Sequence, residues 1–361
     1  MKKKRWIRRI LIIVVILLVF TIAYLIYLFT AYKRLPDRQY EETGITGAYS
    51  YLADDEAINA GRAYNFVTYN IGFGAYTEDY SFFMDGGKHS WAESEEGLMA
   101  NMCEIADVIN RTGADFVLLQ EVDLDGTRSY HINELELMNE FIKGYYYTYT
   151  VNYDSPFICF PLLQPHGKNK SAMVTYSKGA IAQTVRRSLP VADDVSKILD
   201  YDRCYMVSKV PLANEKMLCI YNVHLSAYLK DDSVKKKQLE MLFNDMITEY
   251  KMGNYVICGG DFNQNLKNED DTDAPNWGKT FPRNMIPEGF RVALDEAVPS
   301  NIEHNSCRNA DAPYDEESTY TVTTDGFIIS DNIKVNFYIN CDGGYEFSDH
   351  DPVLMQIILK E

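Results

Sequence analysis

Short apolar runs recur from residue 66 onward, and each has the length of a buried strand. They are Phe66–Ile71, Phe116–Leu119, Ala172–Tyr176, Leu218–Val223, Tyr255–Cys258 and Phe327–Ile329, with a less cleanly alternating run at Leu354–Leu359. Apolar runs this short, bounded by polar turn residues, are typical of strands inside a packed sheet. The pattern therefore predicts a core built largely from strands.

Two other stretches have the spacing of an amphipathic helix. One face of the first carries Leu98, Met102, Ile105 and Ile109, and the second stripe runs from Leu239 to Tyr250. A glycine follows each stripe, at Gly113 and Gly253, which is a common helix stop. Each predicted helix leads into a strand that ends near an acidic residue. Strands and helices mixed in this way within one domain predict a layered α/β sandwich.

The N-terminal apolar segment is of a different kind. Ile10–Tyr32 is 23 residues long and carries no charge. At about 1.5 Å per residue, a helix of this length crosses a bilayer core of roughly 30 Å. A cleaved signal peptide is the alternative, but the stretch is longer than a typical signal core and no A-x-A cleavage site is present. The sequence favours an uncleaved transmembrane anchor.

Basic residues flank this segment unevenly, and the imbalance predicts an orientation. Six precede it and three follow it closely, namely Lys33, Arg34 and Arg38. The positive-inside rule then places the N-terminus in the cytoplasm and the rest of the chain outside the cell. We expect a cytoplasmic tail over residues 1–9, a single-pass anchor over 10–32, a stalk with a short helix near 54–60 over 33–62, and one large domain over 63–361.

Charge divides sharply along the chain. Residues 1–38 hold nine basic residues and one acidic residue, so of the 35 basic and 52 acidic residues the remainder holds 26 and 51, a formal net charge of −25. Proteins that bind nucleic acid strongly usually present a basic surface, because release of counterions drives the binding. We therefore do not expect strong nucleic-acid binding. The seven cysteines are an odd number without a CxxC pair, which excludes a fully paired disulfide framework and disfavours a cysteine zinc site.

Six short polar motifs carry the candidate chemistry, and most of them end an apolar run. In chain order they are TYNIG with Asn70, LLQEVD with Glu121, NVHL with His224, GGDFNQ with Asp261 and Asn263, TTDGFI with Asp325, and SDHDPV with Asp349 and His350. A carboxylate at the mouth of a buried strand, such as Glu121, is a good ligand for a hard cation. The paired glycines before Asp261 allow the tight backbone turn that brings two side chains together.

The two histidines have a different chemistry. Each imidazole can move a proton or stabilise charge on a phosphoryl group. Asp325 is placed to orient one of them, as a buried carboxylate does in a hydrolytic triad, but the sequence leaves open whether its partner is His224 or His350. Taken alone, each residue also has an ordinary structural explanation. The ordered set indicates metal-assisted hydrolysis of a phosphoester.

These motifs resemble the endonuclease/exonuclease/phosphatase superfamily, which includes DNase I-like nucleases, inositol polyphosphate 5-phosphatases and neutral sphingomyelinases. The resemblance runs from about Phe66 to Pro352, and GGDFNQ and SDHDPV are its most specific parts. It implies a four-layered α/β/β/α sandwich with the site at one edge of the two sheets. Here one N-terminal transmembrane helix would precede that fold.

The resemblance also implies a role for each motif residue. Glu121, helped by Asn70, would bind the essential divalent metal, Mg²⁺ or alternatively Mn²⁺, and Asp349 would contact it through water. Asp261 and Asn263 would hold the attacking water and a phosphate oxygen. His350, with Asp325, would orient or deprotonate the nucleophile, and His224 would stabilise the pentacovalent phosphorus. The histidine of NVHL is typical of the nuclease, phosphatase and sphingomyelinase branches. The abasic-site repair branch usually lacks it and carries an acid where this chain has Gly72, which disfavours DNA repair.

The segment from Asn152 to Lys170 links two predicted strands and combines three prolines with large apolar residues, among them Phe157 and Phe160. Two interpretations stay open: a loop packed on its own domain, or a lip over the site that meets lipid. Lys168, Lys170 and Arg128 are candidate phosphate contacts, and each has the alternative of a solvated surface charge.

We expect a monomeric, membrane-anchored, Mg²⁺-dependent hydrolase of a phosphodiester or phosphomonoester, in which water attacks in line. A small phosphoester or a phospholipid headgroup is the favoured substrate. One alternative is an anchored nuclease that degrades extracellular nucleic acid, and another is an inactive protein that only binds a ligand at this site.

Overall fold

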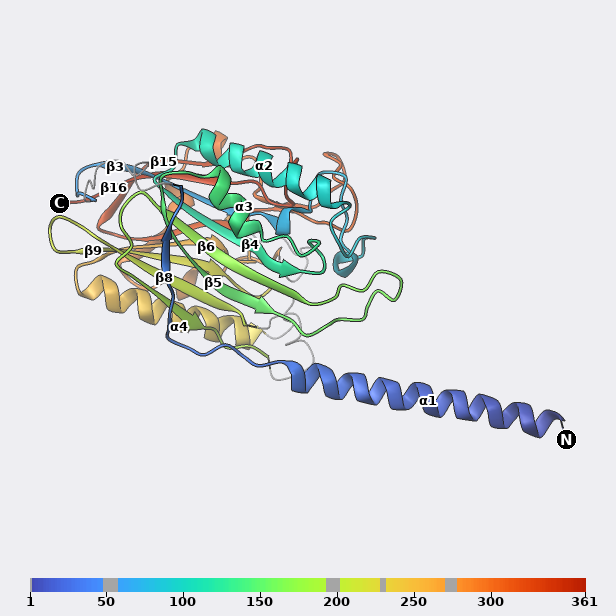
Figure 1. Ribbon diagram of the computed structural model, residues 1–361. Helices are drawn as coiled ribbons and strands as arrows, with labels where there is room; N and C mark the ends of the chain where they lie inside the picture. Colours follow the sequence, from blue (N-terminus) through green and yellow to red (C-terminus); the bar gives the residue numbers. More distant parts are fainter. Residues whose placement is uncertain (1, 48–57, 193–201, 228–231, 270–277) are drawn as a thin grey trace.

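Two seven-stranded sheets pack face to face in this computed structural model, which describes residues 2–47, 58–192, 202–227, 232–269 and 278–361 (Figure 1). The first, here the β9–β10 sheet, has the order β1 (Gln39–Tyr40), β7 (Gln183–Ser188), β8 (Cys204–Pro211), β9 (Met217–His224), β10 (Tyr255–Asp261), β14 (Asp325–Ser330), β11 (Phe290–Val292). The second, the β3–β4 sheet, has the order β15 (Ile333–Asn340), β16 (Val353–Leu359), β3 (Ala63–Asn70), β4 (Phe116–Gly126), β6 (Asn169–Ser177), β5 (Tyr146–Asp154), β2 (Thr43–Ile45).

Helices cover the outer faces of both sheets. The helices α2 (Glu95–Thr112) and α3 (Glu134–Phe141) pack on the β3–β4 sheet, and α4 (Asp232–Lys251) packs on the β9–β10 sheet (Figure 1). A small pair, β12 (Cys307–Arg308) and β13 (Thr321–Val322), lies apart from both sheets in the hydrogen-bonding pattern. The four-layered sandwich predicted from the sequence is confirmed, as are its seven apolar strands and both apolar helices.

Side chains along β3 alternate between the two faces of the sheet, and this alternation decides which of them reach the site. Phe66 belongs to the core between the sheets, whereas Val67 and Tyr69 pack under α2. Successive side chains in a strand point to opposite faces, so Thr68 and Asn70 turn toward the space between the sheets. The same alternation in β4 sends Phe116, Leu118 and Gln120 inward. The polar residues at the strand ends therefore enter the gap between the two sheets.

The segment predicted as a stalk departs from that prediction. Within residues 33–62, β1 pairs with β7 and β2 pairs with β5, so the segment adds an edge strand to each sheet. These pieces are only two and three residues long, too short for an alternating pattern to appear in the sequence. The short helix predicted near residues 54–60 falls largely outside the described residues.

The N-terminal helix α1 (Lys2–Ala31) leaves the sandwich at the end opposite the C-terminus (Figure 1). Its residues Lys4–Ala31 are long and apolar enough to cross a membrane, and most of its large side chains are exposed. A signal sequence meets the same criteria. The end of the helix is fixed to the domain, because Asp202 Oδ1 accepts hydrogen bonds from Tyr32 Oη at 3.2 Å and from Leu35 N at 2.9 Å.

Candidate active site

Parallel pairing brings the polar strand ends together. The strands β3 and β4 are parallel, with Asn70 opposite Gln120, and β9 and β10 are parallel, with His224 opposite Asp261. Antiparallel β14 adds Asp325 directly across from Asp261. Because the carboxyl ends of parallel strands meet at one edge, each sheet brings two of the predicted motifs together. The packing of the two sheets then brings the two pairs together.

A bulge in β4 aims the carboxylate of Glu121. The pairing of β4 with β6 runs from Leu119 opposite Val174 to Val122 opposite Ala172, so two residues of β4 face a single residue of β6. Glu121 takes a left-handed backbone conformation there, with φ 56°. Such bulges re-aim a side chain at the cost of an uncommon backbone conformation, and they occur next to active sites. The bulge directs Glu121 toward His224, whose Nε2 lies 3.9 Å from Oε1.

A buried pair of amides joins the sheets just behind the site. Gln120 Nε2 donates to Asn222 Oδ1 at 2.9 Å, and Asn222 Nδ2 donates to the carbonyl of Val174 at 2.9 Å. Both amide residues are fully buried. Gln120 precedes Glu121 and Asn222 lies two residues before His224. These directional hydrogen bonds therefore fix the position of Glu121 relative to His224 more tightly than apolar packing would.

Asn70 and Asp261 form the centre of the cluster. Asn70 Nδ2 lies 3.2 Å from Asp261 Oδ2, 3.4 Å from Glu121 Oε1 and 3.4 Å from His350 Nε2. Asp261 Oδ2 also accepts from Asn263 Nδ2 at 3.1 Å and lies 3.5 Å from His224 Nε2. The tight turn predicted at the paired glycines is absent, because both lie inside β10. Gly260 instead allows the close approach of β9, since a Cβ there would lie 2.0 Å from the carbonyl oxygen of Val223.

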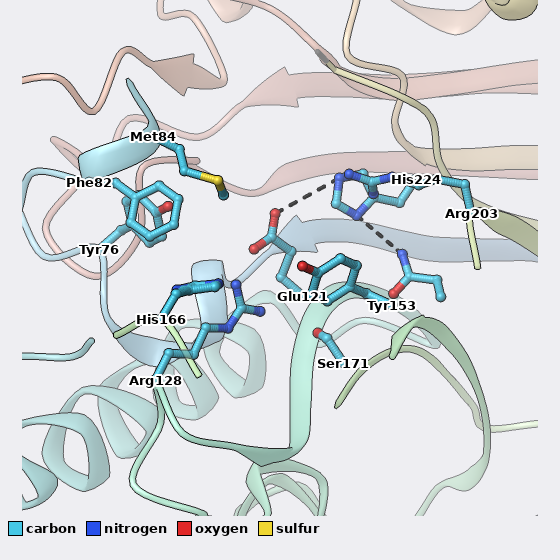
Figure 2. A pocket seen from close by; sticks show the side chains of 11 residues that line it. Tyr76, Phe82, Met84, Glu121, Arg128, Tyr153, His166, Ser171, Arg203 and His224 are labelled. Carbon is cyan, nitrogen blue, oxygen red and sulfur yellow. Dashed lines mark hydrogen bonds and ion pairs between the residues drawn. The ribbon is translucent and has the colours of Figure 1, made fainter. Parts of the chain in front are cut away.

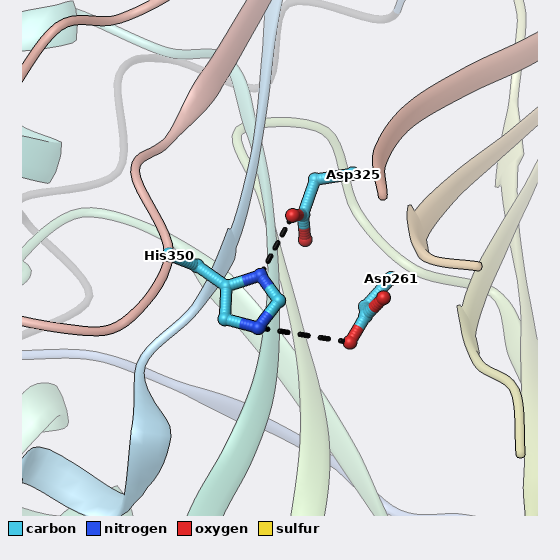
Figure 3. Close-up of side chains that lie close together, drawn as sticks. All are labelled: Asp261, Asp325 and His350. Carbon is cyan, nitrogen blue, oxygen red and sulfur yellow. Dashed lines mark hydrogen bonds and ion pairs between the residues drawn. The ribbon is translucent and has the colours of Figure 1, made fainter. Parts of the chain in front are cut away.

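Asp325 pairs with His350, which resolves the alternative that the sequence leaves open. Its Oδ2 lies 2.7 Å from His350 Nδ1, and the opposite ring nitrogen lies 3.9 Å from Asp261 Oδ2 (Figure 3). Ser306 Oγ donates to the same Oδ2 at 2.8 Å and accepts the backbone N–H of Asp325 at 3.0 Å. Ser306 is not among the residues predicted from the sequence, because no motif of its own marks it.

The two histidines differ in protonation. Burial alone would lower the pKa of His350, but the nearby charges, chiefly that of Asp325 and also that of Asp349, outweigh it and raise the pKa well above its usual range. The pKa of His224 is instead well below its usual range, because of burial and the nearby charge of Arg203. Burial and the charge of Asp325 raise the pKa of Asp261 to about 7. The site therefore combines a charged imidazole, a neutral one and a carboxyl poised near neutrality.

The donor set fits a hard divalent cation. Glu121 and Asp349 line the same cavity with Asp261. Burial, and further the charge of Glu121, raise the pKa of Asp349, a repulsion that a bound cation would relieve. The Asn70 amide does not have the orientation that its predicted role as a metal ligand requires. Its Oδ1 accepts the N–H of Gly72 at 3.1 Å, so this orientation supports it as a donor that holds Glu121 and Asp261.

The open cavity beside these groups has walls that the motifs did not reveal (Figure 2). His224 Nδ1 lies 3.4 Å from Asn152 Nδ2, and Arg203 and Tyr76 each line both this cavity and the adjoining one around His350. Cys307 Sγ lies 3.4 Å from His350 Nε2. The segments that carry Asn152, Arg203, Tyr76 and Cys307 have no recognisable motif, and only the fold brings these four residues to the site.

Of the three predicted phosphate contacts, only Arg128 lines the cavity. Its guanidinium is buried, donates twice to Asp123 at 2.9 and 2.8 Å, and stacks 3.8 Å above the Phe73 ring. Arg128 is therefore held by its own domain. Lys168 is exposed and Lys170 is half-buried, and neither is among the residues that line the described cavities.

Solved structures share this fold at low sequence identity. An endonuclease/exonuclease/phosphatase from Beutenbergia cavernae DSM 12333 has a TM-score of 0.59 and 15% identity, covering 83% of this chain and 72% of that one. ANGEL2, a 2′,3′-cyclic phosphatase solved with adenosine-2′,3′-vanadate, has a TM-score of 0.55 and 16% identity, covering 91% and 100%. Truncated Caenorhabditis elegans TDP2 has a TM-score of 0.50 and 14% identity, covering 83% and 98%.

Comparison with the sequences of curated proteins gave no match. The family model for the endonuclease/exonuclease/phosphatase family, in contrast, matches residues 67–350. That range begins in β3 and ends at His350, so it spans all but the first strands and the last strand of the sandwich. Sequence, fold and the convergence of the motif residues agree, and the chain belongs to the endonuclease/exonuclease/phosphatase family.

Proposed function

We propose that this protein is a membrane-anchored, divalent-metal-dependent phosphoesterase whose catalytic domain lies outside the cell. Members of its family are hydrolases that act on phosphoester bonds. The observation that carries the proposal is the arrangement around Asp261, whose Oδ2 lies within 4 Å of Asn70, His224 and His350 at once. Donors and acceptors converging on one point are what in-line attack on phosphorus requires.

The residues have distinct tasks in this reaction. Glu121 and Asp349 would hold Mg²⁺, which neutralises phosphate charge and orients the ester when bound. Asp261, with a pKa near neutrality, accepts the proton of the attacking water, and Asn263 fixes the carboxylate for that step. His350 is kept charged by Asp325, so in this proposal it is not the base that the sequence allows. It faces the negative charge that develops as the bond from phosphorus to the leaving oxygen breaks. Neutral His224 donates a hydrogen bond to the phosphoryl group.

We favour a small phosphoester or a phospholipid headgroup as the substrate. The net charge of −25 outside the anchor opposes binding of a polyanion, and the anchor keeps the site beside a membrane. ANGEL2, with the same fold, acts on a 2′,3′-cyclic phosphate, which agrees with a phosphodiester of modest size. A nuclease is the rival function. We expect the full-length protein to hydrolyse bis(p-nitrophenyl) phosphate with Mg²⁺ and to lose this activity in EDTA; activity that persists in the chelator contradicts the proposal.

A further inference from the structure

The loop between β5 and β6 is apolar and exposed. From Ser155 to Gly167 it contains no Asp, Glu, Lys or Arg. Its large side chains face solvent, with exposed fractions of 42% for Phe157, 60% for Phe160, 80% for Leu162 and 101% for Leu163. Adjacent apolar side chains this exposed indicate a surface that meets another apolar phase.

This loop is bound to the N-terminal helix. Tyr24 Oη donates to the carbonyl of Phe157 at 3.1 Å and accepts the N–H of Cys159 at 2.9 Å. Tyr27 Oη accepts the N–H of Phe157 at 3.0 Å. The loop and α1 project from the same end of the sandwich (Figure 1). Three hydrogen bonds thus hold the loop against the helix that is long and apolar enough to cross a bilayer.

The two tyrosines also give the depth of the contact. They lie seven and four residues before Ala31, where α1 ends, which is about 10 and 6 Å along a helix. Both belong to the uncharged segment Ile10–Tyr32. Tyrosines near the end of a transmembrane helix lie at the membrane–water interface. A loop bound to them is at the depth of the headgroups and the first acyl carbons.

The backbone of the loop suits this environment. Ile158 and Gly167 exchange N–H···O bonds of 2.9 and 3.0 Å, and Phe160 O accepts the N–H of His166 at 3.1 Å. The loop's prolines, at positions 156, 161 and 165, have no N–H to satisfy. Backbone polar groups that enter lipid need internal partners, and much of this loop has them.

The base of the loop forms part of the active-site cavity. The His166 ring lines the cavity together with Glu121 and His224 (Figure 2). It lies 5.4 Å from the Phe83 ring, which in turn lies 5.9 Å from the Phe160 ring. The depth at which the loop tip lies in the membrane therefore sets the distance between the mouth of the cavity and the lipid surface.

We propose that residues Phe157–Leu163 insert into the membrane leaflet beside α1 and hold the mouth of the catalytic cavity at the lipid surface. The bilayer itself covers this apolar tip, because the loop is hydrogen-bonded to the candidate transmembrane helix. The inference rests on the proposed anchoring function. It also narrows the substrate class to phosphoesters presented at a membrane surface, phospholipid headgroups foremost.

The test uses full-length protein in phosphatidylcholine vesicles with or without brominated acyl chains, which quench nearby tryptophan. Leu163→Trp places a reporter at the exposed tip, and Met252→Trp, 53% exposed at the end of α4, is the matched control. After subtraction of the wild-type signal, we expect brominated lipid to reduce Leu163→Trp emission to about half or less and to leave Met252→Trp unchanged. Adding Leu162→Asp to Leu163→Trp should relieve the quenching.

Equal quenching in the two reporters overturns the inference. So does blue-shifted but unquenched emission of Leu163→Trp, which would mean that protein, a second copy or a partner, covers the tip. Flotation of the wild type with vesicles and hydrolysis of soluble bis(p-nitrophenyl) phosphate are scored separately. Flotation and hydrolysis without quenching defeat only the loop inference. Failure to float defeats the anchor and the inference together, and quenching without hydrolysis defeats only the phosphoesterase.

Discussion

Asp325 holds His350 by a 2.7 Å contact between Oδ2 and Nδ1, and this contact fixes which ring nitrogen faces Asp261. A charged imidazole bound in this way presents an N–H toward the reacting groups without reorganisation during the reaction. Ser306 supports the carboxylate from behind, so the arrangement is a chain of three side chains that ends at the cavity.

Replacing Asp325 with Asn should slow turnover while leaving the fold intact. The amide keeps the shape but removes the charge that holds His350 protonated, so we expect kcat to fall by ~10²–10⁴. Asp107→Asn, on the exposed face of α2, is the control and should retain native kcat. Steady-state kinetics on a soluble phosphodiester is the measurement. A loss below tenfold would show that the charge held on His350 contributes little to turnover.

Glu121→Gln should remove both activity and the response to metal. We expect Mg²⁺ to raise the melting temperature of the wild type in detergent, because a ligand that binds only the folded state stabilises it. The variant should show no such shift and no turnover, whereas Glu104→Gln, exposed on α2, should behave as the wild type. Thermal scans with and without Mg²⁺ provide a readout independent of catalysis. A full Mg²⁺ shift in Glu121→Gln would refute this metal assignment.

Nucleic acid should be a poor substrate. The net charge of −25 outside the anchor opposes binding of a polyanion, so we expect no nicking of supercoiled plasmid under conditions in which the full-length protein hydrolyses bis(p-nitrophenyl) phosphate. Glu121→Gln controls for contaminating nucleases. Nicking by the wild type but not by this variant would establish the rival function and show that the average charge of the domain misleads.

Stability should decline with acidity because of His166. Burial, and then the charge of Arg128, lower the pKa of this residue to about 4. In the unfolded chain His166 binds a proton near pH 6.5, whereas in the folded chain it stays neutral. The contribution of His166 to the free energy of unfolding is therefore complete above pH 6.5 and is lost as pH falls toward 4. The full effect is about 3 kcal/mol. Melting temperatures from pH 7.5 to 4.5 should fall less steeply in His166→Asn, and the exposed control His131→Asn should follow the wild type.

Gly260→Ala should disrupt the site through its backbone. The added Cβ would lie 2.0 Å from the carbonyl oxygen of Val223, so β9 and β10 would have to separate where His224 and Asp261 meet. We expect a loss of at least about 3 kcal/mol in the free energy of unfolding, together with loss of turnover. Gly113→Ala is the matched control, because its φ is also positive but nothing lies within 4 Å of the new Cβ. Equal destabilisation in both variants would show that backbone strain alone is responsible.

Much of the fold was predictable because burial demands continuous apolar runs. Strands such as β10 are buried along their whole length and stand out in the sequence. The strand β15 was missed, since it lies at a sheet edge and several of its residues face solvent. β5 was missed for a related reason: its Tyr and Thr residues alternate between buried and half-exposed positions. Edge and near-edge strands need only one apolar face, and sometimes only part of one, so their pattern is weak.

The sequence by itself determined the chemical groups of the site and the strands that carry them, because polar residues directly after buried strands must emerge at a sheet edge. Only the tertiary structure decided how those groups pair. Three features join residues far apart in the chain. They are the bulge that turns Glu121, the pairing of Asp325 with His350 and not with His224, and the contact of Tyr24 with the β5–β6 loop. Such contacts depend on how sheets and helices pack in space, and no local pattern of residues encodes that geometry.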